Sequence, residues 1–196
     1  MLKSDLRKHT LQQRKAFTAD ELFVLNQQLL NQFKQLDLSK VKSIHLFLPI
    51  VKHNEPNTFL IINWLQQNHP EIIIVVPKAN FKSGTMTHYQ YIGEADLKNN
   101  TYHIPEPLQA PVFDRVPDLV IVPLLAVDKR GYRVGYGKGF YDRFLQSIQT
   151  RKVGLSFFEP IPEIIDVHLN DVRLDQCITP HGIIDFNALN TYYVSL

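Results

Sequence analysis

The stretch DLVIVPLLAVDKRGYRVGYGKGFYDR, residues 118–143, indicates both how this chain folds and what it binds. It opens with a short apolar run typical of a buried strand and closes with residues typical of the start of a helix. Between them Gly135, Gly137 and Gly139 stand at alternate positions, with Lys138 inside the set. Glycine lets a bulky polyanion approach backbone N–H groups, and a helix start adds further unpaired N–H groups. The order of strand, glycine loop and helix therefore predicts a phosphate-binding loop.

Two familiar nucleotide-binding motifs do not fit the spacing of this loop. A Walker A loop needs a glycine five residues before its Gly-Lys pair and a Ser or Thr after it, but Tyr132 and Gly139 stand there. A dinucleotide fingerprint needs a third glycine where this chain has Phe140. The alternative to phosphate binding is a tight glycine turn between a strand and a helix. Lys138 within the loop and the polar residues 141–143 after it favour phosphate binding.

Other charged residues suit the same ligand. Asp142 follows the loop where bound phosphates need a magnesium ligand, because carboxylates beside phosphates commonly hold magnesium. Lys3, Arg7 and Arg14 are four and seven residues apart, so they line one stripe of a helix and are candidates for clamping a triphosphate. The alternative for this stripe is a solvated basic face, which is what most charge stripes are.

Length and composition favour a single domain that binds small anions. The chain of 196 residues, 44% of them hydrophobic, shows no linker or repeat, so we expect one domain over residues 1–196. The net charge of only +2 gives little support for nucleic-acid or membrane binding. Cys177 is the lone cysteine and is expected in the core. No run reaches membrane-spanning length and the start lacks a signal-peptide pattern, so we expect a cytoplasmic protein.

Periodicity predicts an α/β fold, a single-domain three-layer sandwich in which helices cover both faces of a mostly parallel sheet. Thr18 and Glu21 stand in capping-box spacing before the second helix. Ligands are then expected at the carboxyl ends of the strands, where the glycine loop falls. The predicted helices cover residues 2–17, 18–36 and 58–67 and a segment from 140; the predicted strands cover 43–48, 72–76, 119–122 and 153–157, with further strands at 85–91 and near Cys177 and Ile183.

Residues 123–128 and 131–143 resemble the signature of the 5-formyltetrahydrofolate cyclo-ligases, also called methenyltetrahydrofolate synthetases. Weaker similarity lies at residues 55–58, 104–107 and 153–155, and in the segment 168–179. The resemblance implies the conversion of ATP and 5-formyltetrahydrofolate to 5,10-methenyltetrahydrofolate, ADP and phosphate, with Mg²⁺ as cofactor. It also implies small-molecule partners, ATP and a reduced folate, and we expect a monomer that binds neither nucleic acid nor membrane.

The same resemblance implies roles for individual residues. Lys138, Arg133 and Asp142 are the expected catalytic residues, and Ile50, Glu55 and Tyr136 the expected folate contacts. Asp142 and Asp175 are the expected metal ligands, with Asp171 as the weaker candidate beside them. The expected ATP contacts are Lys3, Arg7, Arg14, Arg133, Val134, Gly135, Tyr136, Gly137, Lys138, Gly139, Phe140 and Tyr141.

The loop after the first strand departs from the family pattern. A Glu-x-Asp-Thr sequence is usual there, and this chain has Asn57 in place of the aspartate. Two other functions stay open from the sequence. One is another phosphate-handling enzyme on a similar scaffold, such as a sugar-phosphate isomerase, and the other is a non-catalytic nucleotide- or folate-binding module.

Overall fold

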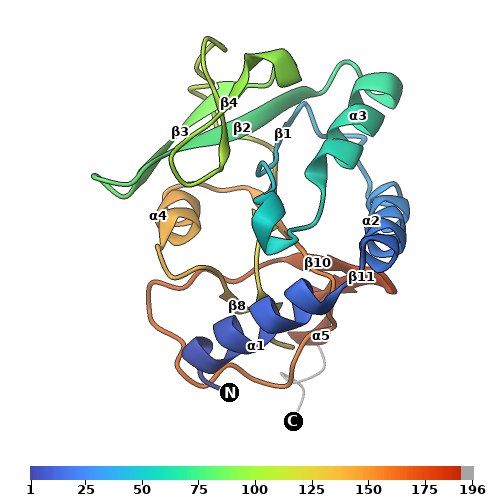
Figure 1. The fold of residues 1–196 in the computed structure, drawn as a ribbon, viewed down its shortest axis with the longest axis vertical. Helices are drawn as coiled ribbons and strands as arrows, with labels where there is room; N and C mark the ends of the chain where they lie inside the picture. The colour runs from blue at the N-terminus through green and yellow to red at the C-terminus, as the bar shows by residue number, and fades with distance from the viewer. Residues whose placement is uncertain (191–196) are drawn as a thin grey trace.

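The computed structural model describes residues 1–190, and a seven-stranded sheet forms its centre (Figure 1). The strands follow the order β11-β10-β9-β6-β1-β2-β3. Neighbours from β10 to β2 run parallel, whereas β11 and β3 join the two edges antiparallel. The strands are β1 (Ser43–His45), β2 (Ile73–Asn80), β3 (Thr85–Gln90), β6 (Leu119–Pro123), β9 (Arg151–Leu155), β10 (Gln176–Thr179) and β11 (Gly182–Asp185).

Helices cover both faces of this sheet, as the alternation along β6 shows. Leu119 and Ile121 pack into one core with α2 (Ala19–Phe33) and α3 (Thr58–Asn68). Val120 and Val122 point to the opposite face and pack with α4 (Phe140–Gln146) and α5 (Phe186–Asn190). The predicted α/β fold, a three-layer sandwich around a mostly parallel sheet, is therefore confirmed.

The start of α2 shows how local sequence determines an element boundary. Thr18 Oγ1 accepts a hydrogen bond from the Glu21 N–H at 3.2 Å, and Glu21 Oε2 accepts one from the Thr18 N–H at 2.8 Å. This reciprocal pair satisfies backbone donors that the first helical turn leaves without partners. The capping box predicted from the spacing is confirmed.

Helix α1 (Lys3–Ala16) lies beside the short hairpin that follows β6 (Figure 1). The hairpin consists of β7 (Ala126–Val127) and β8 (Arg133–Val134), and Leu6 of α1 packs into a small cluster with Ala126 and Val134. This packing brings the N-terminal helix to the carboxyl end of β6. The remaining short elements are η1 (Val51–His53), η2 (Glu94–Asp96), β4 (Leu97–Asn99) and β5 (Pro105–Pro107).

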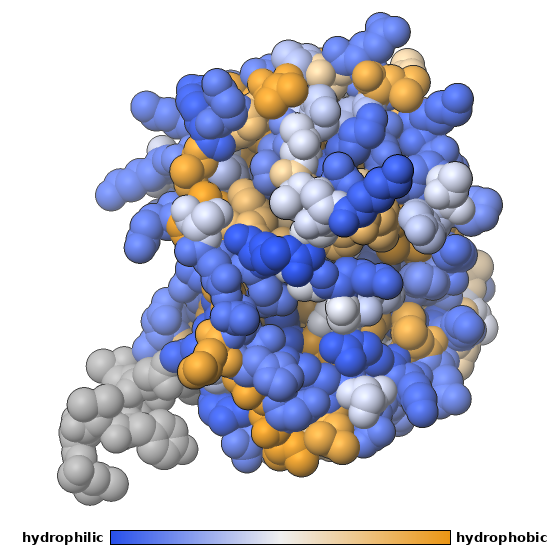
Figure 2. Space-filling model, turned by 90° about the vertical axis from the view of Figure 1, so that its left-hand side faces the viewer, coloured by the Kyte–Doolittle hydropathy of each residue, from blue (hydrophilic) through white to orange (hydrophobic). Residues whose placement is uncertain are grey.

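The face that carries α4 and the β2–β3 hairpin is mainly hydrophilic (Figure 2). Apolar residues on this face occur in small groups rather than in one continuous patch. Among the described residues, every helix is too short or too polar to span a lipid bilayer.

Candidate active site

A cavity of about 480 Å³ lies at the carboxyl ends of β1 and β6, beside the glycine loop. Segments that are far apart in the sequence form its walls. They include α1, the loop after β1, the β2–β3 hairpin, residues 102–106 and the loop that leads into α4. The lining residues include Lys3, Arg7, Phe47, Leu48, Ile50, Lys52, His53, Glu55, Phe81, Met86, Tyr102, Arg133, Gly135, Tyr136, Gly137, Lys138, Gly139, Phe140, Tyr141, Asp142 and Asp171.

The glycine loop has a backbone that only glycine adopts without strain. Gly137 and Gly139 have φ angles of +84° and +68°. A Cβ on Gly139 would approach the Arg143 guanidinium to 2.8 Å, so the end of that side chain would have to move. The same guanidinium donates a hydrogen bond from Nη2 to the Lys138 carbonyl at 2.7 Å. The Arg143 guanidinium thus holds the loop through a backbone carbonyl, and the exposed side chain of Lys138 stays available to bind a ligand.

Cations from separate elements line the part of the cavity nearest the loop. Arg7 of α1 donates from Nε to the Gly135 carbonyl at 2.8 Å, which leaves its terminal nitrogens for a ligand. Arg133 donates from Nη2 to Asp142 Oδ1 at 2.9 Å. Together with Lys138, these side chains give this end of the cavity the charge that a polyphosphate needs.

Two carboxylates, Asp142 and Asp171, line the same end of the cavity. Asp142 Oδ1 accepts hydrogen bonds from Arg133 and from the Val172 N–H, whereas Oδ2 accepts none within the described residues. Asp171 forms an ion pair with Lys3. Burial opposes ionisation of Asp171, but the hydrogen bonds from Lys3 and from the His168 N–H outweigh it and lower the pKa of this carboxyl. Asp171 is therefore a carboxylate at neutral pH.

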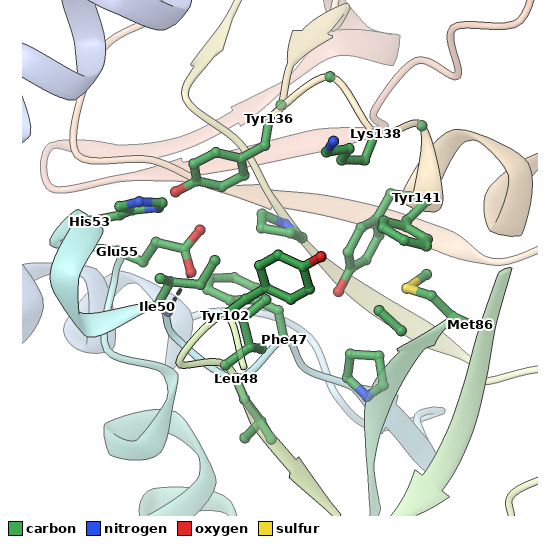
Figure 3. A pocket seen from close by; sticks show the side chains of 18 of the residues that line it. Phe47, Leu48, Ile50, His53, Glu55, Met86, Tyr102, Tyr136, Lys138 and Tyr141 are labelled. Carbon is green, nitrogen blue, oxygen red and sulfur yellow. Dashed lines mark hydrogen bonds between the residues drawn. The ribbon is translucent and has the colours of Figure 1, made fainter. Parts of the chain in front are cut away.

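The opposite end of the cavity is apolar apart from a few polar groups. Glu55, His53 and Tyr136 gather there, over walls that include Phe47, Leu48 and Tyr102 (Figure 3). Glu55 Oε2 accepts a hydrogen bond from the Ile50 N–H at 2.7 Å. The His53 and Tyr136 rings stack with centroids 5.3 Å apart. An apolar slot with one buried carboxylate suits a flat heterocycle that donates hydrogen bonds.

Comparison with known proteins relates this arrangement to one family. The model of the 5-formyltetrahydrofolate cyclo-ligase family matches residues 1–180. The chain belongs to this family. A 5-formyltetrahydrofolate cyclo-ligase of Escherichia coli K12 is 34% identical over 110 residues, which cover 53% of this chain and 60% of the relative. The relative from Mycoplasma pneumoniae is 30% identical over 167 residues, which cover 80% of this chain and 86% of that protein.

A solved structure of a cyclo-ligase family protein shares the fold. The structure of 5,10-methenyltetrahydrofolate synthetase from Aquifex aeolicus superposes with a TM-score of 0.78 at 28% identity. The superposition covers 95% of this chain and 93% of the other. The family resemblance that the sequence predicted is therefore confirmed.

Most of the site residues expected for a cyclo-ligase meet at the one cavity. Among the lining residues are the expected ATP contacts Lys3, Arg7 and Arg133, the expected folate contacts Ile50 and Glu55, and the loop from Gly135 through Tyr141, with Asp142 directly after it. Tyr141 is expected to contact ATP, and its hydroxyl is buried without a hydrogen-bond partner in the described part of the chain. Burial raises the pKa of this phenol, so the group stays protonated.

Three expected site residues are absent from the cavity wall. Arg14 is fully buried and donates from Nη2 to the Leu124 carbonyl at 2.6 Å, because the last turn of α1 passes behind the wall. Val134 follows Arg133 on a strand, so its side chain points the other way, into the cluster with Leu6.

Asp175 is the third of these residues. It precedes β10, and the parallel pairing with β9 places it at the amino ends of the strands, away from the cavity. There Asp175 Oδ2 accepts hydrogen bonds from the Lys152 N–H at 2.7 Å and pairs with Lys152 Nζ at 3.0 Å. The structure does not bring Asp175 together with Asp142, whereas Asp171 lines the cavity with Asp142.

Sequence reasoning missed several wall residues. Lys52 and His53 belong to the single turn η1, which no periodicity marks. Phe81 and Met86 come from the β2–β3 hairpin. The period-two alternation of residues 85–91 was the one available signal for Met86, since alternate residues of a strand share a face.

Proposed function

We propose that this protein converts 5-formyltetrahydrofolate to 5,10-methenyltetrahydrofolate, with ATP as co-substrate and Mg²⁺ as cofactor. The observation that carries the proposal is that one cavity joins a cationic glycine loop to an apolar slot containing Glu55. A phosphoryl donor and a flat, hydrogen-bonding acceptor must meet within one site for this reaction. Membership of the cyclo-ligase family supports the same assignment.

The chemistry requires that a formamide oxygen become a leaving group. The formyl oxygen attacks the γ-phosphorus of ATP, and the bond from phosphorus to the ADP oxygen breaks. The N5 lone pair forms a C=N bond, which gives an iminium phosphate. N10 then attacks the formyl carbon, the C–O bond breaks with its electron pair leaving on phosphate, and N10 loses its proton. This route asks the protein chiefly for positioning and charge neutralisation.

Residues on the cavity wall supply these two requirements. Lys138, Arg7 and Arg133 neutralise the phosphates as charge moves to the ADP oxygen. The backbone N–H groups of the glycine loop add fixed dipoles. Glu55 and Tyr136, which lie together in the cavity (Figure 3), would orient the heterocycle so that its formyl oxygen faces the γ-phosphate. The site therefore needs no strong base.

Asp142 and Asp171 fit a magnesium ion at the phosphate end. Mg²⁺ commonly takes one or two carboxylates and completes its shell with water and phosphate oxygens. Asp142 Oδ2 has no other partner among the described residues, and both carboxylates line the cavity. A bound Mg²⁺ would neutralise the transferred phosphate.

The test is a spectrophotometric assay with 5-formyltetrahydrofolate, ATP and Mg²⁺, following the near-ultraviolet absorbance of the methenyl product. We expect the absorbance to grow only when ATP is present. If folded protein binds ATP without forming product or ADP, it is a binding module. If it instead acts on a sugar phosphate without ATP, the isomerase alternative is correct.

A further inference from the structure

Arg14 is a buried cation that the proposed reaction leaves unexplained. Its side chain is 0% exposed and donates one hydrogen bond, from Nη2 to the Leu124 carbonyl at 2.6 Å. Its Nε and Nη1 have no hydrogen-bond partner within residues 1–190. Guanidinium stays charged in proteins, and a buried charge is costly unless an opposite charge lies near it. Arg14 therefore requires a group of opposite charge in its surroundings.

Tyr136 and, after it, Glu55 favour the charged form of Arg14, and Glu55 is the carboxyl of the two. Glu55 is 7% exposed, and its charge and that of Arg14 favour one another, although the described residues show no direct ion pair between them. The main chain ties the two residues together as well, because Asn54, directly before Glu55, donates from Nδ2 to the Arg14 carbonyl at 2.7 Å. Tyr136 interacts with both, and its buried hydroxyl has no hydrogen-bond partner in the described part of the chain.

Other titratable groups around Glu55 do not replace Arg14. His53 comes from η1, and burial, with help from Lys52, Lys15 and Arg14, lowers its pKa, so this ring is neutral near pH 7. Lys52 of η1 is exposed and therefore screened by solvent. The phenols of Tyr136 from the glycine loop and Tyr141 from α4 stay protonated because burial raises the pKa of both.

We propose that Arg14 is a positioning residue that acts from behind the cavity wall and keeps Glu55 charged toward the folate. A charged carboxylate accepts hydrogen bonds at both oxygens, whereas a protonated one turns one oxygen into a donor. The N–H edge of a folate heterocycle matches the charged form. Burial raises the pKa of Glu55 above its usual value, and the Ile50 N–H, Tyr136 and the charge of Arg14 limit that rise. This inference rests on the proposed function.

The experiment compares Arg14→Met, which keeps side-chain length, with Arg14→Lys, which keeps the charge. Lys8→Met is the matched control, because Lys8 is an exposed cation of the same helix. Dissociation constants for 5-formyltetrahydrofolate without ATP are measured from pH 5.5 to 8.5, a range set by the unperturbed carboxyl pKa and about 1–3 units of charge-dependent shift. We expect wild type, Arg14→Lys and Lys8→Met to bind alike near neutral pH.

In Arg14→Met the apparent pKa for loss of binding should rise by about 1–3 units, the shift that a nearby charge produces. Affinity should weaken about tenfold at neutral pH for each unit by which that pKa exceeds the pH. KM should rise with kcat nearly kept, because the group binds and does not react. An Arg14→Met pH profile that matches wild type overturns the inference.

A second measurement covers the case in which Arg14→Met does not fold. Wild-type protein carrying ¹³C-labelled glutamate carboxyls is titrated by NMR, with the Glu55 signal assigned from Glu55→Gln. A Glu55 that is ionised at pH 7 supports the inference, and one that is protonated there overturns it. This titration needs no turnover, so it still decides whether Glu55 is charged, which the inference requires, if the wild type fails to make product and the proposed function falls.

Discussion

Lys138 is the residue whose loss should affect catalysis most without affecting the fold. Its side chain is exposed, lines the cavity and forms no ion pair in the described part of the chain. Lys138→Ala should lower kcat by about 10²–10³, the loss typical when one preorganised donor to a developing charge is removed. The melting temperature should barely change, because exposed substitutions usually stay within about 0.5 kcal/mol. Lys82→Ala, at an exposed turn outside the cavity, is the control; equal rates for the two variants would contradict this role.

Asp171 and Asp175 are close in sequence, but their substitution should affect magnesium binding differently. Asp171 lines the cavity, whereas Asp175 pairs with Lys152 at the other end of the strands. Asp171→Asn should raise the Mg²⁺ concentration for half-maximal rate by at least about tenfold, the loss that even outer-shell changes cause. Asp175→Asn should leave that concentration unchanged. The measurement is a magnesium titration of the initial rate at saturating ATP, and the reverse order of effects would restore Asp175 as the ligand.

These residues mark the limit of prediction from spacing. Asp171 and Asp175 are four residues apart, and sequence alone does not tell which one precedes the strand and which one reaches the cavity. Arg14 shares a helical stripe with Lys3 and Arg7, but the helix extends past the edge of the cavity, so the stripe continues into the interior. The glycine loop was easier to predict, because its backbone conformation requires glycine at Gly137 and Gly139.

At the scale of elements, β1, β3 and α4 meet around His45, which is buried, and His88, which is half-buried. The rings of His45 and His88 lie 5.1 Å apart, and Phe144 of α4 lies 4.1 Å from His88. Both nitrogens of His45 lack hydrogen-bond partners within residues 1–190. Burial lowers the pKa of His88 to about 4, and burial together with the nearby His88 holds the pKa of His45 well below its usual value. Both rings are therefore neutral in the folded protein near pH 7.

This packing predicts that acid destabilises the fold. In the unfolded chain both histidines titrate near their usual pKa of about 6.5, so the unfolded state binds more protons below that pH. Stability is then fully present above about pH 6.5 and falls toward pH 4, by up to about 1.4 kcal/mol per pH unit for each histidine. Denaturant unfolding at several pH values measures this. His88→Phe should flatten the decline of stability with falling pH, whereas His9→Gln, at an exposed position, should not. If stability declines with the same slope in both variants, His45 and His88 are not the cause.

The boundaries of helices and strands were predictable where a capping motif or a run of apolar residues marked them. The capping box at Thr18 and the apolar strand runs correspond to observed elements. The hairpin of β7 and β8 was missed because its strands have two residues each, too few to show alternation. That hairpin supports α1 and presents Arg133, so part of the site depends on an element that periodicity does not detect.

At the scale of the whole molecule, one wall of the cavity is built from three segments that are distant in sequence. Lys3 donates its backbone N–H to Asp166 Oδ1 at 2.8 Å and pairs through its side chain with Asp171. The Ile165 N–H donates to the Met1 carbonyl at 3.1 Å, and Arg7 donates to the Gly135 carbonyl at 2.8 Å. The start of α1, the segment around residues 165–171 and the glycine loop therefore support one another.

A ligand that bridges these segments should order all three at once. We expect Mg²⁺ and ATP, added without folate, to slow backbone hydrogen exchange in residues 1–9, 135–141 and 165–172 together, because a ligand that binds only the folded arrangement suppresses local opening. Helices α2 and α3, which cover one face of the sheet and lie outside this wall, serve as the internal control and should change least. Protection confined to residues 135–141 would mean that the loop binds the phosphates without α1. In that case Lys3 and Arg7 would stabilise the fold and would not contact the nucleotide.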